Sequence, residues 1–355
     1  MTRRGLALAL LLVAASGVRA QAPPAALPGD ARWASTSAPA STRKQDDIWF
    51  VDPDRGWYVN GSGEVRGTTD GGETWTLLVE KPGTYFRAIA FLDDRNGFAG
   101  NIGPGYFPGV TDSVALYRTG DGGATWTPVE LPAPVEGLCA IDIVRDDAAV
   151  VVHAGGRVGG PAWLLRSLDA GRTWTRIDLS SHAAMILDVH FFDVANGIVC
   201  AASDADLGVS RAIILGTSDG GATWEERYRS QRPFETTWKA SFPSRNAGYV
   251  TVQSYDPNKQ NTKRYVAKTL DGGVTWREIA LVDDHEVREF GVGFATEETG
   301  WVGTSTGGFQ TTDGGATWTR VEMGRYVNKI RIVPAHNGFV AYAVGREVYR
   351  LDARR

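Results

Sequence analysis

An eight-residue phrase, Ser/Thr-x-Asp-x-Gly-x-Thr-Trp, occurs six times in this chain at intervals of about 40 to 50 residues. An Asp at this position can accept hydrogen bonds from the backbone of the turn that it begins, and the following Gly supplies the positive φ of a tight hairpin. We expect the Trp to open the next strand. Repetition at this spacing predicts an array or propeller of similar units. The repeated aspartates are Asp70, Asp121, Asp169, Asp219, Asp271 and Asp313.

A second phrase counts the units better than the first. It consists of two apolar residues, a polar turn and then Gly or Ala, which lies six positions after the second apolar residue in every copy. We interpret it as strand A, a turn and strand B, with the eight-residue phrase then joining strands C and D. The apolar pairs number seven: Ile48/Phe50, Ile89/Phe91, Ile141/Ile143, Val189/Phe191, Ala240/Phe242, Val292/Phe294 and Ile330/Ile332.

The last unit lacks a fourth strand, because the chain ends shortly after Leu351. Trp33 precedes the first strand A in the same way that each repeated Trp precedes a later one. We therefore expect the segment around Trp33 to complete the last blade and leave no open edge. The sequence predicts an all-β fold, a single seven-bladed β-propeller over residues 32–352 with four-stranded antiparallel blades.

The first 31 residues predict export. Arg3 and Arg4 precede an apolar run over residues 6–15, and small residues precede a cleavage point after Ala20. We expect a signal peptide over residues 1–20, a disordered leader over residues 21–31 and a periplasmic or extracellular location. No later apolar run reaches transmembrane length. The net charge of −4 becomes −7 once three signal-peptide arginines are lost, which argues against nucleic-acid binding.

The sequence shows no metal, cofactor or catalytic motif. Each repeated turn carries one carboxylate where a calcium loop needs several oxygens, and the five His have no ligand spacing. Cys139 and Cys200 could form a disulfide in an exported protein, although we favour two buried free thiols. We therefore expect no cofactor, no metal and no catalytic residue.

The topology separates the loops into two faces. The A–B turns and the repeated C–D turns share one face, so we look for binding residues among the B–C and D–A loops of the other. Arginine and aromatic side chains are favoured binding anchors. The binding candidates are Tyr85, Arg87, Tyr106, Phe107, Arg232, Trp238, Arg288, Arg325 and Tyr326. Asp142, His190 and Arg331 occupy the middle position of strand A and should line the central channel, as a water-filled polar lining rather than a catalytic group.

The eight-residue phrase resembles the Asp-box, or bacterial neuraminidase repeat, of propeller blades. Proteins with this repeat include sialidases, xyloglucanases, sorting receptors and photosystem II assembly factors, so the resemblance implies a fold more than an activity. A sialidase would need an early Phe-Arg-Ile-Pro-like string, but Phe86-Arg87-Ala88-Ile89 lacks the Pro. A xyloglucanase-like enzyme would need two opposed carboxylates, usually between two propellers.

The fullest resemblance is to the photosystem II assembly and stability factors, through the signal peptide, seven blades and strings such as IAFLDDRNGFAG and VHFFDVANGIV. It implies a non-enzymatic, monomeric propeller that binds a protein or peptide partner of a membrane-associated complex. Arginines in the loops would suit an acidic or C-terminal peptide: Arg87, Arg232, Arg288 and Arg325. The alternative is a carbohydrate-binding protein or a glycoside hydrolase.

Overall fold

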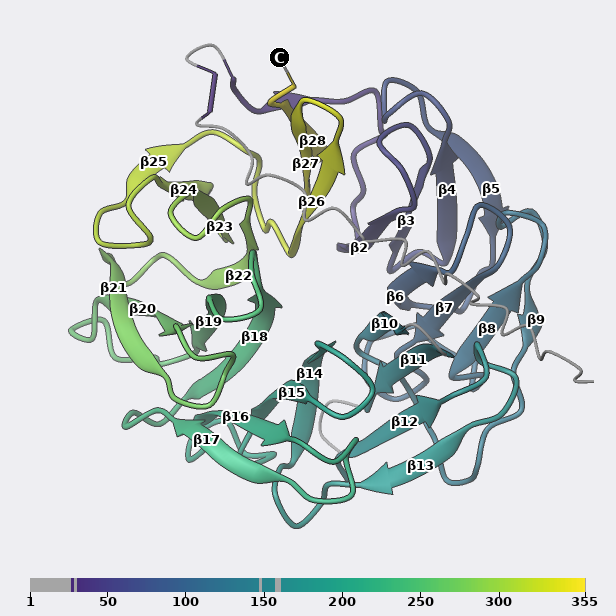
Figure 1. The fold of residues 1–355 in the computed structure, drawn as a ribbon, viewed down its shortest axis with the longest axis horizontal. Coiled ribbons are helices and arrows are strands. Elements are labelled where there is room, and N and C mark those ends of the chain that lie inside the picture. The colour runs from purple at the N-terminus through teal and green to yellow at the C-terminus, as the bar shows by residue number, and fades with distance from the viewer. Residues whose placement is uncertain (1–26, 29–30, 147–148, 157–160, 355) are drawn as a thin grey trace, which may run out of the picture.

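Seven four-stranded antiparallel sheets form the blades of a ring in this computed structural model (Figure 1). The structure describes residues 27–28, 31–146, 149–156 and 161–354. Within them, no helix is long and apolar enough to cross a membrane. The predicted signal peptide, and the leader apart from residues 27, 28 and 31, lie outside these residues.

Blades 1 to 4 each take four consecutive strands. Blade 1 contains β2 (Gln45–Phe50), β3 (Gly56–Asn60), β4 (Glu64–Thr68) and β5 (Thr76–Glu80). Blade 2 contains β6 (Phe86–Phe91), β7 (Gly97–Asn101), β8 (Leu116–Thr119) and β9 (Thr127–Pro128). Blade 3 contains β10 (Ile141–Asp146), β11 (Ala149–Gly155), β12 (Trp163–Ser167) and β13 (Thr175–Asp178). Blade 4 contains β14 (Met185–Phe191), β15 (Gly197–Ala202), β16 (Ala212–Thr217) and β17 (Glu225–Arg229).

Blades 5 and 6 repeat this order, whereas blade 7 combines both ends of the chain. Blade 5 contains β18 (Glu235–Ser241), β19 (Gly248–Ser254), β20 (Lys263–Thr269) and β21 (Arg277–Asp283). Blade 6 contains β22 (Glu289–Phe294), β23 (Gly300–Thr304), β24 (Gly308–Thr311) and β25 (Thr319–Val321). Blade 7 contains β26 (Lys329–Ala335), β27 (Gly338–Val344), β28 (Val348–Asp352) and β1 (Ala34–Ser35).

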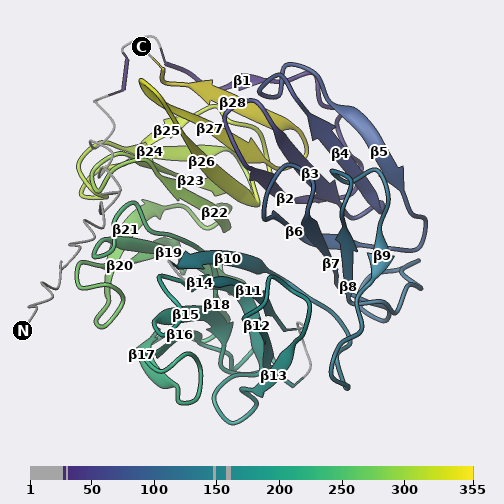
Figure 2. The ribbon, with the colours of Figure 1, turned by 45° about the vertical axis from the view of Figure 1, so that its right-hand side comes forward.

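The pairing of β1 with β28 confirms the predicted closure of the ring (Figure 2). The strands are antiparallel, with Ala34 opposite Arg350. Trp33 anchors this short strand, because the residue is only 9% exposed and its ring meets Trp301 of blade 6 edge-on at 5.6 Å. On the other side of blade 7, Tyr342 stacks on Phe50 of blade 1 at 4.0 Å.

The eight-residue phrase forms the predicted C–D turn in all six copies. In blade 1, the Asp70 carboxylate accepts hydrogen bonds from the backbone N–H of Thr74 at 2.9 Å and from the Thr68 hydroxyl at 2.7 Å. These hydrogen bonds close the turn around glycines with positive φ, such as Gly72. The following strand begins one residue after the Trp rather than at it, at Thr76 after Trp75 in blade 1.

Packing explains the glycine of the second phrase. A Cβ on Gly97 would lie 2.6 Å from the Phe91 ring, because strand A folds its terminal aromatic side chain over strand B. The corresponding pairs in blades 1, 4, 5 and 6 are equally close. Blades 3 and 7 carry Ile143 and Ile332 instead of the aromatic residue, and there strand A continues for three more residues.

Candidate functional site: a pocket on the propeller axis

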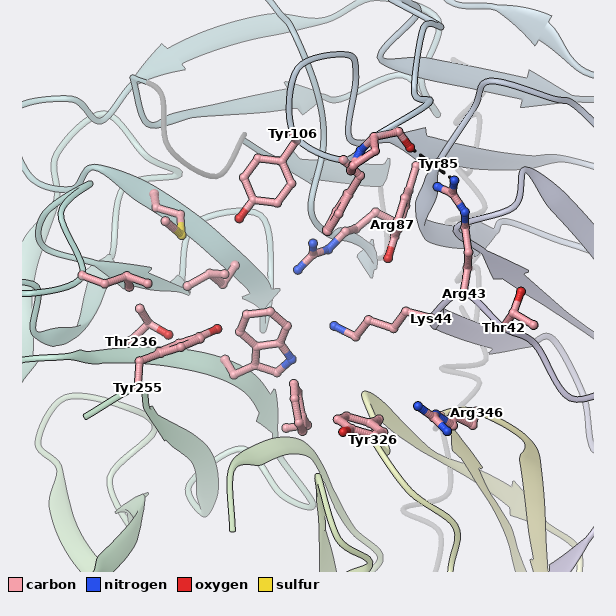
Figure 3. Close-up of a pocket in the computed structure, with 18 residues that line it drawn as sticks. Thr42, Arg43, Lys44, Tyr85, Arg87, Tyr106, Thr236, Tyr255, Tyr326 and Arg346 are labelled. Atoms are coloured by element: carbon pink, nitrogen blue, oxygen red, sulfur yellow. Dashed lines mark hydrogen bonds between the residues drawn. The ribbon is translucent and has the colours of Figure 1, made fainter. Parts of the chain in front are cut away.

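A pocket of about 620 Å³ opens where the strands A begin, on the face opposite the six repeated turns. The side chains around it come from the D–A and B–C loops and from the first residues of strands A (Figure 3). The pocket therefore lies on the face where the topology predicts binding. Its lining includes Arg43, Lys44, Tyr85, Arg87, Tyr106, Phe107, Met185, Leu187, Trp238, Tyr255, Phe290, Tyr326 and Arg346.

Two equivalent positions of the repeat supply nine of the eighteen residues that line the pocket. We call the residues two places before the first apolar residue of strand A the floor set, and those four places before it the wall set. The first set is Asp46, Arg87, Cys139, Leu187, Trp238, Phe290 and Asn328; the second is Lys44, Tyr85, Gly137, Met185, Thr236, Arg288 and Tyr326. Asp46, Cys139 and Asn328 of the floor set, and Gly137 and Arg288 of the wall set, do not line the pocket themselves.

A break in strand pairing turns the floor residues inward. In β2, β6, β14, β18 and β22 the register with the next strand shifts at this position, so that Arg87 of β6, for example, has no partner on β7. A β-bulge of this kind redirects the side chain of the extra residue. Each of these five strands A thus turns one side chain toward the propeller axis.

The floor has a charged part contributed by blades 1 and 2. Lys44 Nζ lies 3.5 Å from Asp46 Oδ1, and Arg87 Nε lies 3.8 Å from the same oxygen. Asp46 is fully buried and its second carboxylate oxygen has no hydrogen-bond partner. One carboxylate therefore faces two cations, and Figure 3 shows both cationic groups directed toward the middle of the pocket.

A second group of buried charges lies next to the floor. Asp188 lies 3.4 Å from Lys239 Nζ and 3.7 Å from Lys329 Nζ. Lys239 also donates a hydrogen bond to the carbonyl of Leu187 at 3.1 Å. Here again one carboxylate faces two ammonium groups, so the two groups of charges leave an excess of positive charge at the axis. Burial lowers the pKa of Lys329, and Lys239 and Arg331 add to this effect.

Burial lowers the pKa of Lys44 to about 7; repulsion by Arg87 and Lys239 acts in the same direction, while Asp46 opposes it. Its ammonium group lies 4.6 Å from the centre of the Trp238 ring and 5.2 Å from that of Phe290. Lys44 thus lies between the charged and the aromatic parts of the floor.

Aromatic and aliphatic side chains form most of the remaining lining. Trp238 meets Phe290 edge-on at 5.8 Å, and Tyr85 stacks on Phe107 at 4.5 Å. The Trp238 Nε1–H donates to Asn328 at 2.9 Å, which fixes the ring across the axis from blade 5 to blade 7. The pocket can therefore hold a ligand that has one apolar part and one anionic part.

Six of the nine predicted binding residues line this pocket: Tyr85, Arg87, Tyr106, Phe107, Trp238 and Tyr326. Arg232 lies away from it, between the carboxylates of Glu235 at 2.6 Å and Glu278 at 2.8 Å. Arg288 lies over the ring of Tyr255, a lining residue, at 4.6 Å. Arg325 is exposed and is not part of the lining.

The three predicted channel residues fall into two separate groups. His190 lies 3.4 Å from Asp142, whose carboxylate accepts backbone hydrogen bonds from Ile143 at 3.0 Å and Phe191 at 2.9 Å. Arg331 instead pairs with Asp47 at 3.8 Å. Asp142 therefore joins blade 3 to blade 4 through the backbone, which is a structural use of the carboxylate.

Sequence reasoning missed Lys44, Asp46, Leu187 and Phe290 as site residues. They lie just ahead of the apolar pairs, outside the strands as we drew them. Extending the seven-fold alignment backwards by four positions would have found them, because both sets of pocket residues then form columns. Cys139 belongs to the floor set, and both it and Cys200 are buried and form no disulfide, which is the alternative that we favoured.

The charged side chains that line the pocket are all cationic. Four cationic side chains line the described pocket, namely Arg43, Lys44, Arg87 and Arg346, and none of its lining residues is Asp or Glu. An acid–base pair of the glycosidase type is therefore not present in this lining. In the part of the chain that the structure describes, no three His, Cys, Asp or Glu side chains form a candidate metal site.

No family model matches the chain. The photosystem II stability/assembly factor HCF136 of Arabidopsis thaliana is 27% identical over 197 residues, which are 55% of this chain and 45% of that protein. The assembly lipoprotein Ycf48 of Synechococcus is 27% identical over 140 residues, which are 39% of this chain and 35% of that protein. The chain resembles the photosystem II stability and assembly factors. It spans less than half the length of these relatives.

Solved structures of these assembly factors have the same fold. A YCF48 structure described as bound to D1 peptide has a TM-score of 0.64 at 16% identity, over 94% of this chain and 97% of the other. The GH74 xyloglucanase of Xanthomonas campestris has a TM-score of 0.65 at 15% identity, over 91% of this chain but 54% of the enzyme. At these identities, the similarity establishes the fold alone.

Proposed function

We propose that this protein is an exported, non-enzymatic assembly or stability factor that binds a protein or peptide segment in the axial pocket. The observation that carries the proposal is a lining with four cationic side chains and no carboxylate, next to a wall of aromatic rings. Such a site favours a segment with an acidic side chain or a free carboxyl terminus beside an apolar residue.

The curated relatives support the same assignment. Their names describe photosystem II assembly factors, and one structural neighbour is described as bound to D1 peptide. The proposal takes from them peptide binding and a link to a membrane-associated complex, and leaves the identity of the complex open. The predicted signal peptide would place the protein in the periplasm or outside the cell. We propose that it acts there as a monomer.

Peptide binding can be measured with a pool of fluorescein-labelled pentapeptides that end in Leu, Phe or Ala with a free carboxyl group. We expect saturable binding by fluorescence anisotropy, and weaker binding of the matched C-terminal amides. The substitution Arg346→Met removes an exposed cation from the pocket rim and is therefore suited to this test. Hydrogen bonds to charged groups contribute about 1.5–3 kcal/mol, so affinity should fall about ten- to hundredfold.

Arg172→Met is the matched control, since Arg172 is exposed on a repeated turn of the opposite face. We expect it to leave the affinity unchanged. Equal losses in the two variants, or equal binding of acids and amides, would contradict an anionic ligand in the pocket.

A carbohydrate is the second candidate ligand, because the GH74 enzyme shares the fold and aromatic rings line the pocket. Xyloglucan oligosaccharides would then bind in a manner sensitive to Trp238→Ala and insensitive to Arg346→Met. Saturable oligosaccharide binding without any peptide binding would favour this alternative.

A further inference from the structure

The charges at the axis are unequal in how firmly they are held. Lys239 and Lys329 share the buried Asp188, and Lys239 also donates to a backbone carbonyl. The Arg87 guanidinium keeps its proton throughout the accessible pH range. Lys44 shares its carboxylate partner, Asp46, with Arg87, and its amine is directed toward the open pocket (Figure 3).

The surroundings of Lys44 tolerate both of its protonation states. The aromatic rings of Trp238 and Phe290 attract the ammonium form. Burial and the neighbouring cations Arg87 and Lys239 favour the neutral amine. Because these influences oppose one another, an anion that enters the pocket can shift the equilibrium between the ammonium and the neutral form of Lys44.

We propose that Lys44 is the charge switch of the pocket, which holds the anionic group of the ligand while it is protonated and releases that group after it loses the proton. This inference rests on the proposed function and adds its regulation. An anion beside Lys44 favours the ammonium form, so ligand binding and proton binding reinforce each other. Binding is strongest in mildly acidic solution and weakens as the solution becomes alkaline.

The midpoint follows from the pKa of about 7 for Lys44 in the ligand-free protein. Below this value the charge is already present, and the affinity is constant. Above it, each ligand must also recruit a proton, so the affinity falls up to about tenfold per pH unit. Between pH 6.5 and 8.5 we expect a loss of about ten- to thirtyfold.

Other titratable groups around the axis act differently, with one exception. Burial raises the pKa of Tyr85, and that of Tyr255 to about 12, so both stay neutral across this range. The exception is Glu289 on β22, where burial raises the pKa to about 8. Its carboxyl accepts from the backbone N–H of Tyr265 at 3.2 Å, away from the pocket. The remaining charged or titratable groups that face this region are Arg43, Arg346, Tyr106, Tyr326, Asp46, Arg87, Cys139, Asp188, Lys239, Arg288 and Lys329.

The first measurement needs no ligand. The chain contains seven lysines, so the side-chain signals of ¹³C-lysine-labelled protein should be resolvable by NMR. We expect one signal to titrate near pH 7 and to be missing in Lys44→Arg. A titration near neutrality that persists in Lys44→Arg, or its absence from the wild type, would overturn the assignment.

The second measurement follows the pentapeptide pool across pH 6.5 to 8.5. Lys44→Arg keeps the charge and should bind with little pH dependence, whereas Lys44→Met should bind weakly throughout. Glu289→Gln should retain the wild-type profile, as should Lys259→Arg, which changes an exposed lysine outside the pocket. Circular dichroism of each variant separates loss of fold from loss of binding.

The two proposals fail in different ways. Binding of the pool that does not change with pH, or that changes equally in Lys44→Arg, overturns the switch and leaves the proposed function standing. Absence of binding at every pH, with folded protein, overturns the proposed function and the switch that rests on it.

Discussion

The packing of single side chains determines which residues fit at certain positions of the blades. Phe91 lies across Gly97 so closely that a Cβ there would fall inside the ring contact. Trp57 of the neighbouring blade stacks on the other side of Phe91 at 3.6 Å. The ring therefore has little room to move, and the glycine is needed for its lack of a side chain rather than for its backbone freedom.

The substitution Gly97→Ala should destabilise the fold by about 1–3 kcal/mol, because overpacking of a filled interior costs that much. Gly120→Ala in the same blade is the control, since its nearest neighbour would be 3.8 Å from the new Cβ. Urea unfolding followed by tryptophan fluorescence gives both values. Similar midpoints for the two variants would show that Phe91 can yield.

At the scale of the secondary-structure element, hydrogen bonds to one aspartate hold each of the six repeated turns between strands C and D. Hydrogen bonds from the side chain and backbone of Thr74 hold the pKa of the Asp70 carboxyl at about 2. The other five aspartates have pKa values lowered to about 2 as well. A lowered carboxyl pKa stabilises the folded chain above the unfolded value and loses that effect as the pH falls toward 2.

Thermal stability should therefore decline between about pH 4 and pH 2 as these carboxylates gain protons. Asp70→Asn should lower the melting temperature at pH 7 and have a smaller effect near pH 2, where the wild-type carboxyl is also neutral. Melting curves by circular dichroism at both pH values test this. A constant difference between variant and wild type would show that the charge of Asp70 does not support the turn.

The elements also show what the sequence could reveal of this molecule. Six turns and seven strand pairs were predictable because tight hairpins and buried strands restrict residue types locally. The bulges that aim Arg87 and Trp238 into the pocket were not, since a register shift depends on the partner strand. Nor could the sequence show that Arg232 lies outside the pocket, since its partner Glu278 lies 46 residues away along the chain.

At the scale of the whole molecule, two residues of β1 complete the ring. Their pairing with β28 is short, so most of the closure must come from side chains. Trp33 packs with Trp301, Phe339 and Leu351 in one buried cluster of blades 6 and 7.

Trp33→Ala should destabilise the propeller by about 3 kcal/mol or more, through the loss of a buried aromatic side chain. Ser35→Ala, at an exposed position of the same strand, should change stability by less than about 0.5 kcal/mol. Hydrogen exchange should show faster exchange in β28 for Trp33→Ala. Unchanged exchange there would mean that β1 does not hold the ring closed.

One repeat position occurs in each of the seven blades, and in four of them, at Arg87, Leu187, Trp238 and Phe290, its side chain lines the pocket. Neighbouring floor residues thus come from separate sheets, and each can be exchanged without rebuilding the strand beside it. Ligand preference can then evolve, or be engineered, by single substitutions at this one repeat position. In this chain the position is occupied by residues from Asp46 through Trp238 to Asn328, and a different set of residues there would select a different ligand on the same propeller.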